Sequence, residues 1–505
     1  MSLLLFLIYF SFFSYLIFKI KLEKYKFFNR KYLLSIFIIK IAVGISLNFL
    51  YSNYYKEKGK ADIYKYYDDS KFIYNSLWEN PQHFFQLISG YKNDDIDLNI
   101  YLDSTMNWKY QTSNFKEITN TSNITLSNHR TVTKFNALVR IFSFGNINIH
   151  VLFMSFISLL GCLLIFKAYY KFIDETNLKL FIPIVFLTPS VLVWSSGILK
   201  EGLIIFGFGV FIYAMVNLSK NIYKYIFWIA LSILLISFTK YYLVLILIPP
   251  TILYLTPFKS KILIVLKYSF FILSFLFVFN SFDSVSTLLF DKIKTKRSEQ
   301  IRTSIGGFYY IQINNDNFQR IVRFEKELIT TRNSSDPKNN SLFLYAEKGL
   351  KYQVYDGGLN KEFLKTNSKY RYYFLDAFNK AGSYYILPEL NETTLGLTNS
   401  SFKALINVFS KPFNFLKGSL LLRLGSLENL IIICLICFLF FKRKLKISNL
   451  NLLLFNILFI SLLYVVIGLT IPVIGGLVRY KMMGLLLLLI SLLMTFKGKK
   501  LNIKL

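Results

Sequence analysis

In the stretch "PSVLVWSSGILKEGLIIFGFGVFIYAMV" at residues 189–216, a lysine and a glutamate stand between two long apolar runs. Apolar runs of this length with almost no charge are typical of membrane-spanning helices. Lys200 and Glu201 therefore lie at the junction between two predicted spans. The side of the membrane that this junction faces determines what the two charges can do.

The composition places the whole chain in the same class. Of its 505 residues, 54% are hydrophobic and 18% are aromatic, and the mean hydropathy is +0.44. Soluble domains rarely reach such values, so we expect an all-α polytopic membrane protein. The three cysteines lie inside apolar runs, which favours membrane packing over redox or zinc chemistry for Cys162, Cys434 and Cys437.

The net charge of +31 does not indicate a nucleic-acid partner. The basic residues are not gathered on one soluble domain but fall in short clusters between apolar segments, which is the pattern that sets membrane topology. The chain has no Walker A or G-x-G-x-x-G motif. Their absence favours a substrate borne by the membrane over a soluble nucleotide.

Apolar runs predict about eleven transmembrane helices, at residues 2–20, 33–51, 149–169, 178–194, 197–217, 225–239, 241–257, 262–281, 428–441, 450–470 and 482–496. The chain then divides into five parts: two spans (1–51), a first large loop (52–148), a six-helix core (149–281), a second large loop (282–427), and three spans with a basic tail (428–505).

Charge distribution predicts the orientation. The first connector, "KLEKYKFFNRKY" at 21–32, is strongly basic with one glutamate, so the positive-inside rule places it in the cytoplasm and the N-terminus outside. Alternation then places the other short basic connectors and the tail "KGKKLNIKL" (497–505) inside, and both large loops outside. We expect an integral protein of a bacterial cytoplasmic membrane, in contact with membrane lipids.

Three junctions on the predicted outer side nevertheless carry cations. The cations are Lys200, Lys240, Arg479 and Lys481, in "SSGILKEG", "SFTKYYL" and "GGLVRYK". Together with their neighbours Glu201 and Tyr480, they are the candidate substrate-binding residues. Because basic residues are disfavoured on this side, we infer that they bind an anion such as a lipid phosphate, which arginine holds as a fork and lysine as a point charge. The alternative is that they snorkel or pair with neighbouring side chains.

The first large loop supplies carboxylates. In "ADIYKYYDDSKFIYNSLWENP" (61–81), apolar residues recur at helical spacing, which predicts an amphipathic helix along the membrane surface. Asp62 and Asp69 are two turns apart and share a face, with Asp68 beside them. A carboxylate near the interface can act as a general base towards a sugar hydroxyl, whereas the alternative is a solvated polar face.

Other parts of the large loops carry weaker signals. The stripe of Phe135, Leu138, Val139 and Phe142 predicts a second surface helix before the third span. In the second large loop, short extended or turn-bounded pieces are expected rather than a separate folded domain. With three histidines in the chain and no paired spacing, no metal site and no cofactor are predicted, although assistance by a divalent cation stays open.

A multi-span protein with an acidic surface helix in its first outer loop resembles the GT-C superfamily of membrane glycosyltransferases. Several of those enzymes have a D-E-x-x-Y-like motif in this loop, and "DIYKY" places Asp62 and Tyr66 at the matching spacing, while Ile63 replaces the second acid. The resemblance implies a catalytic carboxylate at Asp62 or Asp69. It also implies transfer of a sugar from a polyprenyl-phosphate carrier to a glycan or a lipid-linked acceptor.

The chain is also similar to the repeat-unit polymerases of bacterial surface polysaccharides, which use a diphosphate-linked oligosaccharide. The expected function is therefore a membrane glycosyltransferase of cell-surface polysaccharide synthesis, with a polymerase as the alternative. An alternative of another class is a flippase or transporter of lipid-linked sugars. Transporters usually have broken helices and polar groups at mid-membrane depth, and apart from Lys40 the sequence indicates neither.

The topology is testable with reporter fusions. A phosphatase that is active only outside the cytoplasm should be active when fused within 52–148, because that loop is predicted to face outward. A fluorescent protein that folds only in the cytoplasm should fluoresce when fused after residue 505. The opposite pattern of activities would refute the orientation.

Overall fold

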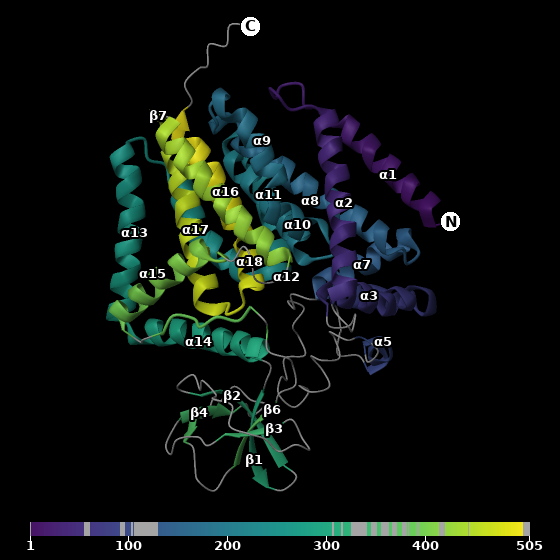
Figure 1. Ribbon diagram of the computed structural model, residues 1–505, viewed down its shortest axis with the longest axis vertical. Helices are drawn as coiled ribbons and strands as arrows, with labels where there is room; N and C mark the ends of the chain where they lie inside the picture. Colours follow the sequence, from purple (N-terminus) through teal and green to yellow (C-terminus); the bar gives the residue numbers. More distant parts are fainter. Residues whose placement is uncertain are drawn as a thin grey trace.

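The structure is a computed structural model that describes residues 2–54, 61–90, 96–102, 105, 130–305, 308–314, 317–324, 341–344, 351–354, 363–365, 371–375, 381, 383–390, 393–413, 420–442 and 444–497. Within these ranges the chain is mainly a bundle of helices (Figure 1).

Nine helical segments in the described part are long and apolar enough to cross a membrane. They are formed by α1 (Ser2–Lys19), α2 (Arg30–Tyr54), α8 (Ile147–Tyr169), α9 (Leu178–Leu187) with α10 (Pro189–Ser196), α12 (Ile222–Leu255), α13 (Lys261–Ser281), α16 (Leu420–Lys442), α17 (Leu450–Thr470) and α18 (Ile474–Thr495). The prediction of a polytopic helical membrane protein is therefore confirmed, and the count of eleven spans stays a prediction.

Two predicted spans, 225–239 and 241–257, are the halves of α12. At Lys240 the backbone leaves helical geometry, with φ −151° and ψ 86°. The first half runs beside α11 (Lys200–Val216), where the rings of Tyr213 and Tyr225 lie 6.3 Å apart. In the second half, the Tyr254 carbonyl accepts a hydrogen bond from Asn451 near the start of α17. The kink at Lys240 thus lies at one end of the bundle.

The boundaries of two later spans differ from the prediction. α16 begins at Leu420 rather than near 428, and α18 begins at Ile474 rather than near 482. Charged residues in the first turns, such as Arg423 and Arg479, lower the hydropathy without ending the helix. Arg479 and Lys481 therefore lie within α18, not in the connector before it.

The expectation of unbroken spans is also wrong. α9 ends at Leu187, and α10 starts at Pro189, whose missing N–H and fixed φ suit the first turn of a new helix. The Ser190 N–H donates to Glu428 Oε1 at 2.8 Å. A buried carboxylate from α16 thus satisfies an N–H at the helix break, deep within the apolar bundle.

Shorter helices cross one end of the bundle. Helices are present at both predicted positions, as α3 (Asp62–Glu79) and α7 (Arg130–Ser143), and their place at a membrane surface stays a prediction. Figure 1 shows α3 and α14 (Asp283–Ile305) running across this end at a large angle to the spans. The remaining helices are α4 (Pro81–Ser89), α5 (Asn99–Leu102), α15 (Thr394–Ser410) and single 3₁₀ turns at Ile96–Leu98, Tyr170–Phe172, Glu175–Asn177 and Leu218–Lys220.

The second large loop contains a sheet, which corrects the expectation of isolated extended pieces. Its strands pair antiparallel in the order β3-β6-β1-β2-β4-β5, and Tyr310 lies opposite both Arg320 and Tyr373. The strands are β1 (Phe308–Asn314), β2 (Asn317–Phe324), β3 (Ser341–Leu344), β4 (Lys351–Val354), β5 (Phe363–Lys365) and β6 (Arg371–Leu375). A second ladder, β7 (Lys444–Leu445) with β8 (Phe496–Lys497), joins the far ends of α17 and α18.

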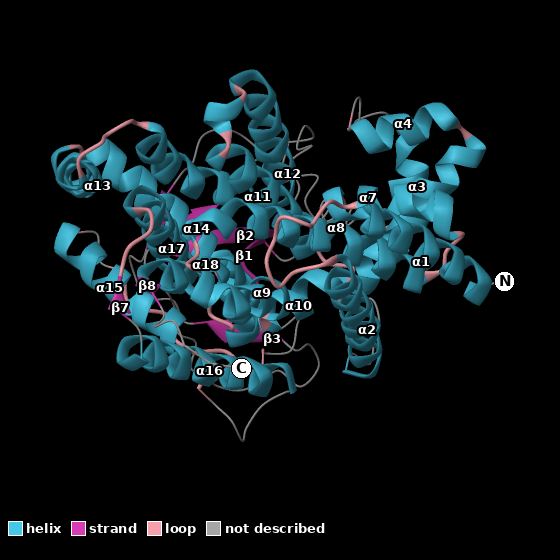
Figure 2. Cartoon of the chain, turned by 90° about the horizontal axis from the view of Figure 1, so that it is seen from above, coloured by secondary structure: helices cyan, strands magenta, loops and turns pink. Residues whose placement is uncertain are grey.

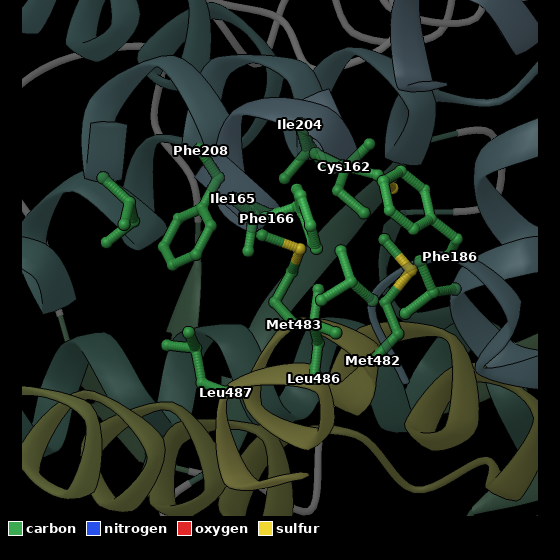
Figure 3. Packing of buried hydrophobic residues seen from close by; sticks show 14 of the residues in the cluster. Cys162, Ile165, Phe166, Phe186, Ile204, Phe208, Met482, Met483, Leu486 and Leu487 are labelled. Carbon is green, nitrogen blue, oxygen red and sulfur yellow. The ribbon is translucent and has the colours of Figure 1, made fainter. Parts of the chain in front are cut away.

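The core lies where α8, α11, α17 and α18 meet. In the most apolar 18-residue stretch of each span, 78% of the residues are buried in α8 and in α18. The corresponding share is 11% in α1 and 17% in α13, which lie at the periphery (Figure 2). Figure 3 shows Cys162 and Phe166 of α8 with Met482 and Met483 of α18 in this core. Cys162 is thus a packing residue, as predicted.

Glycines allow α8 and α11 to approach closely. A Cβ at Gly209 would lie 2.3 Å from the Gly161 carbonyl oxygen, and one at Gly161 would lie 2.5 Å from the Ile205 carbonyl oxygen. Backbone atoms cannot move aside as a flexible side chain can. Small residues at such crossings permit the close helix packing that stabilises membrane bundles.

Gly161→Ala and Gly209→Ala should each destabilise the protein by about 1–3 kcal/mol, because the added methyl separates two packed helices. Thermal unfolding in detergent measures the effect. Gly475→Ala in α18 is the matched control, since no atom lies within 4 Å of a Cβ there, and it should be neutral or slightly stabilising. Equal melting temperatures for all three variants would contradict this packing.

Candidate functional site

Helix α3 is fixed across the end of the bundle by Arg140 of α7. The Arg140 side chain donates to Ser70 Oγ at 2.7 Å and to the Tyr67 carbonyl at 2.6 Å, and its guanidinium lies 4.2 Å from the Tyr67 ring centre. The Tyr67 hydroxyl donates to the Gly145 carbonyl in the turn before α8. These contacts set the position of α3, and therefore of Asp62 in its first turn.

Three further elements bring charges to the same place. α11 starts at Lys200, after the extended residue Leu199, and carries Glu201 in its first turn. Lys240 lies at the kink of α12, and Arg479 lies in the second turn of α18. We call Asp62, Lys200, Glu201, Lys240 and Arg479 the charged cluster.

Arg479 is the centre of the charged cluster. Its Nη1 lies 2.9 Å from Asp62 Oδ2 and its Nη2 lies 2.7 Å from Glu201 Oε2. Lys240 Nζ lies 3.3 Å from the other oxygen of Glu201. The side chain of Glu201 is 1% exposed, whereas that of Asp62 is 37% exposed. Asp62 is therefore the carboxylate of the cluster that solvent or a substrate can reach.

Aromatic rings line the charged cluster. The Lys240 ammonium lies 3.7 Å from the centre of the Tyr480 ring, and the Arg479 guanidinium lies 5.8 Å from that of Trp194. Both distances allow cation–π attraction. Burial, together with the Asp62 carboxylate, raises the pKa of Tyr66 well above its usual value, so its hydroxyl stays protonated. Trp194 was missed by sequence reasoning, although it stands only six residues before Lys200 in the stretch 189–216.

Two donors of the charged cluster make no hydrogen bond or ion pair within the described residues, and one of them, Arg479 Nε, is fully buried. Lys200 is 6% exposed, and within the described ranges no carboxylate or carbonyl lies at hydrogen-bonding or ion-pair distance from its ammonium. Arg479 Nε is buried and likewise has no partner in the described part of the chain. Leaving a buried donor unsatisfied costs about 1–3 kcal/mol, and more when the group is charged. An anion between them would satisfy both.

The structure separates other predicted residues from the cluster. Lys481 points away from Arg479, because two residues on a helix differ by about 200°. Its ammonium donates to Asn429 Oδ1 at 2.9 Å and to the Lys411 carbonyl at 2.8 Å, which ties α18 to α16 and to the end of α15. Asp69 is buried on α3, two turns or about 10 Å from Asp62, whereas Asp68 is exposed.

The space at the cluster is small. A cavity of about 10 Å³ is lined by Glu201, Lys240, Tyr242, Arg479 and Tyr480, together with apolar side chains of α11, α12 and α18. This volume holds about one water molecule. A larger ligand requires the elements around the cluster to move apart.

The chain matches no family model, and neither the curated proteins nor the solved structures include a match. The function must therefore be inferred from the charged cluster itself. Among the described residues, no group of three or more His, Cys, Asp or Glu side chains is arranged to hold a metal ion.

The buried pair of Arg479 and Glu201 should dominate the stability of this end of the bundle. Arg479→Ala should lower the unfolding free energy by about 3–5 kcal/mol, because it leaves the Glu201 carboxylate with Lys240 alone. Adding Glu201→Ala in the same chain should recover part of the loss. Thermal unfolding of the single and double variants measures the coupling, and strictly additive losses would contradict the pair.

Proposed function

We propose that this protein is an integral membrane glycosyltransferase that transfers a sugar from a polyprenyl-phosphate carrier to a glycan or a lipid-linked acceptor. The observation that carries the proposal is the buried Arg479 Nε without an acceptor and the mostly buried Lys200 without an ion pair among the described residues, beside the partly exposed Asp62. A phosphate offers acceptor oxygens to both donors. Asp62 offers a base within the same cluster.

The electrostatics of α11 support an anion at this position. Lys200 lies at the N-terminus of a 17-residue helix, where the helix dipole is positive and a cation is disfavoured. Glu201 offsets part of that cost, but it is held by Arg479 and Lys240. An anionic ligand would interact favourably with both Lys200 and the helix terminus.

The charge of the cluster favours a particular donor. Its three cations and two carboxylates leave one net positive charge. A sugar linked through a single phosphate is a phosphodiester with one negative charge, which balances the cluster. A diphosphate-linked donor carries two negative charges. We therefore favour transfer from a monophosphate carrier over polymerisation from a diphosphate carrier.

The proposed reaction exchanges one ion pair for another. The donor phosphate takes the place of Asp62 on Arg479, and the released Asp62 carboxylate accepts the proton of the acceptor hydroxyl. The acceptor oxygen forms a bond to the anomeric carbon while the bond from that carbon to the phosphate oxygen breaks. Lys200, Lys240 and Arg479 stabilise the negative charge that stays on the carrier phosphate.

The positive-inside pattern favours the outer face of a cytoplasmic membrane for this chemistry, since the basic connector 21–32 lies at the other end of the bundle. A flippase for lipid-linked sugars is the second candidate. The break between α9 and α10 and the kink at Lys240 favour it, because discontinuous helices commonly form transport sites.

The test is sugar transfer by purified protein in vesicles that contain a polyprenyl-phosphate sugar with a radiolabelled hexose. Asp62→Asn should slow transfer by about 10²- to 10⁴-fold, the usual contribution of a general base. Asp68→Asn is the matched control, since Asp68 is exposed on the same helix, and it should retain activity.

The products distinguish the candidates. Addition of one sugar per acceptor supports the transferase, and a ladder of repeating oligosaccharides supports the polymerase. Movement of the intact labelled lipid between leaflets, without a new glycosidic bond, supports the flippase. Equal activity of the Asp62→Asn and Asp68→Asn variants would refute the role of Asp62.

A further inference from the structure

A second concave site lies at the opposite end of the bundle from the charged cluster. It is a groove of about 970 Å³ between the linker that joins α1 to α2 and the start of α9, lined by apolar, aromatic and basic side chains. This volume is in the range of small-molecule binding sites. The groove shares no residue with the charged cluster, and the proposed reaction does not use it.

The apolar wall of the groove is rigid. Phe28 stacks on Phe186 with ring centres 5.0 Å apart, and Tyr25 packs edge-on against Tyr170 at 4.8 Å. Leu22 and Phe28 are each 2% exposed, so the linker is packed into the bundle core. The wall therefore exists before any ligand binds.

Phe27 adds an unusual backbone conformation at the groove. Its φ of +62° lies in the left-handed region, which a bulky residue rarely adopts. Its ring is 49% exposed and lines the groove, with the Lys179 ammonium 5.2 Å from the ring centre. A strained residue that keeps an aromatic side chain exposed is typical of a ligand-binding position.

The charges of the groove favour an anion. Arg30, Lys31 and Lys179 line it against one carboxylate, Glu23. Arg30 is already held by Glu23 and by the Ile20 carbonyl. Lys31 and Lys179 are exposed and make no ion pair with another described residue. Two available ammonium groups above an apolar wall, at the end of the membrane spans, match the headgroup and upper acyl chains of a lipid.

We propose that this groove binds an anionic phospholipid of the surrounding bilayer, with Lys31 and Lys179 pairing with its headgroup phosphate. The apolar wall contacts the first methylenes of the acyl chains. Phe27 lies between the two, and Tyr25 and Tyr32 line the same groove, as expected for a membrane–water interface, where tyrosine is enriched. The lipid joins the linker to α9 and thereby stabilises the end of the bundle that carries no charged cluster.

The test uses the full-length protein in a neutral detergent, with phosphatidylglycerol or phosphatidylcholine added and bound lipid counted by native mass spectrometry. Phosphatidylglycerol should bind more tightly than phosphatidylcholine and should raise the melting temperature. The Lys31→Ala/Lys179→Ala variant should bind phosphatidylglycerol about thirtyfold more weakly, the combined effect expected of two lysines near an anionic headgroup.

Lys220→Ala/Lys224→Ala is the matched control, because both lysines are exposed and lie outside the groove. It should bind the lipid like the unaltered protein. Equal binding of the two lipids, or equal losses in the two double variants, would overturn the proposal. Stabilisation by soluble glycerol phosphate as large as that by the lipid would also overturn it, because the apolar wall would then play no part.

Discussion

The fork of Arg479 between Asp62 and Glu201 is the interaction on which this end of the molecule depends. It joins α3, which lies across the bundle, to α11 and α18, which form its core. A guanidinium in an apolar bundle is tolerated only where carboxylates offset its desolvation, and here the two carboxylates come from different elements, α3 and α11. Together with the contacts of Arg140, the pair of Asp62 and Arg479 aligns α3 on the spans.

The sequence predicts the class of fold and the surface helices well because both depend on local periodicity. The stripe from Phe135 to Phe142 became α7, and the acids after Ala61 became α3. Helix starts were harder, since Arg423 and Arg479 resemble the ends of spans, although Arg423 is exposed and Arg479 is paired with Asp62 and Glu201 inside the helices. The sheet was missed because its strands are short and, apart from the hairpin of β1 and β2, they pair between segments far apart in the sequence.

The candidate site was predicted as a list of residues but not as a geometry. Lys200, Lys240 and Arg479 do converge, yet Lys481 is separated from them by a helix face. Glu201, adjacent to Lys200 in sequence, organises the cations rather than binding an anion. The choice between Asp62 and Asp69 depends on which one reaches Arg479, and this follows from the docking of α3 by Arg140. Such long-range choices cannot be derived from spacing.

The closed cavity at the charged cluster indicates which contact must yield first. Glu201 is buried and shared by two cations, so separating it from Arg479 would expose two charges to an apolar environment. Asp62 is partly solvated and makes its contact through one oxygen to one nitrogen. Water can replace that contact at low cost, as it does at surface ion pairs. Opening should therefore separate α3 from α18 and leave α11, α12 and α18 together. This one movement would free both the Asp62 carboxylate and the Arg479 guanidinium from their mutual ion pair.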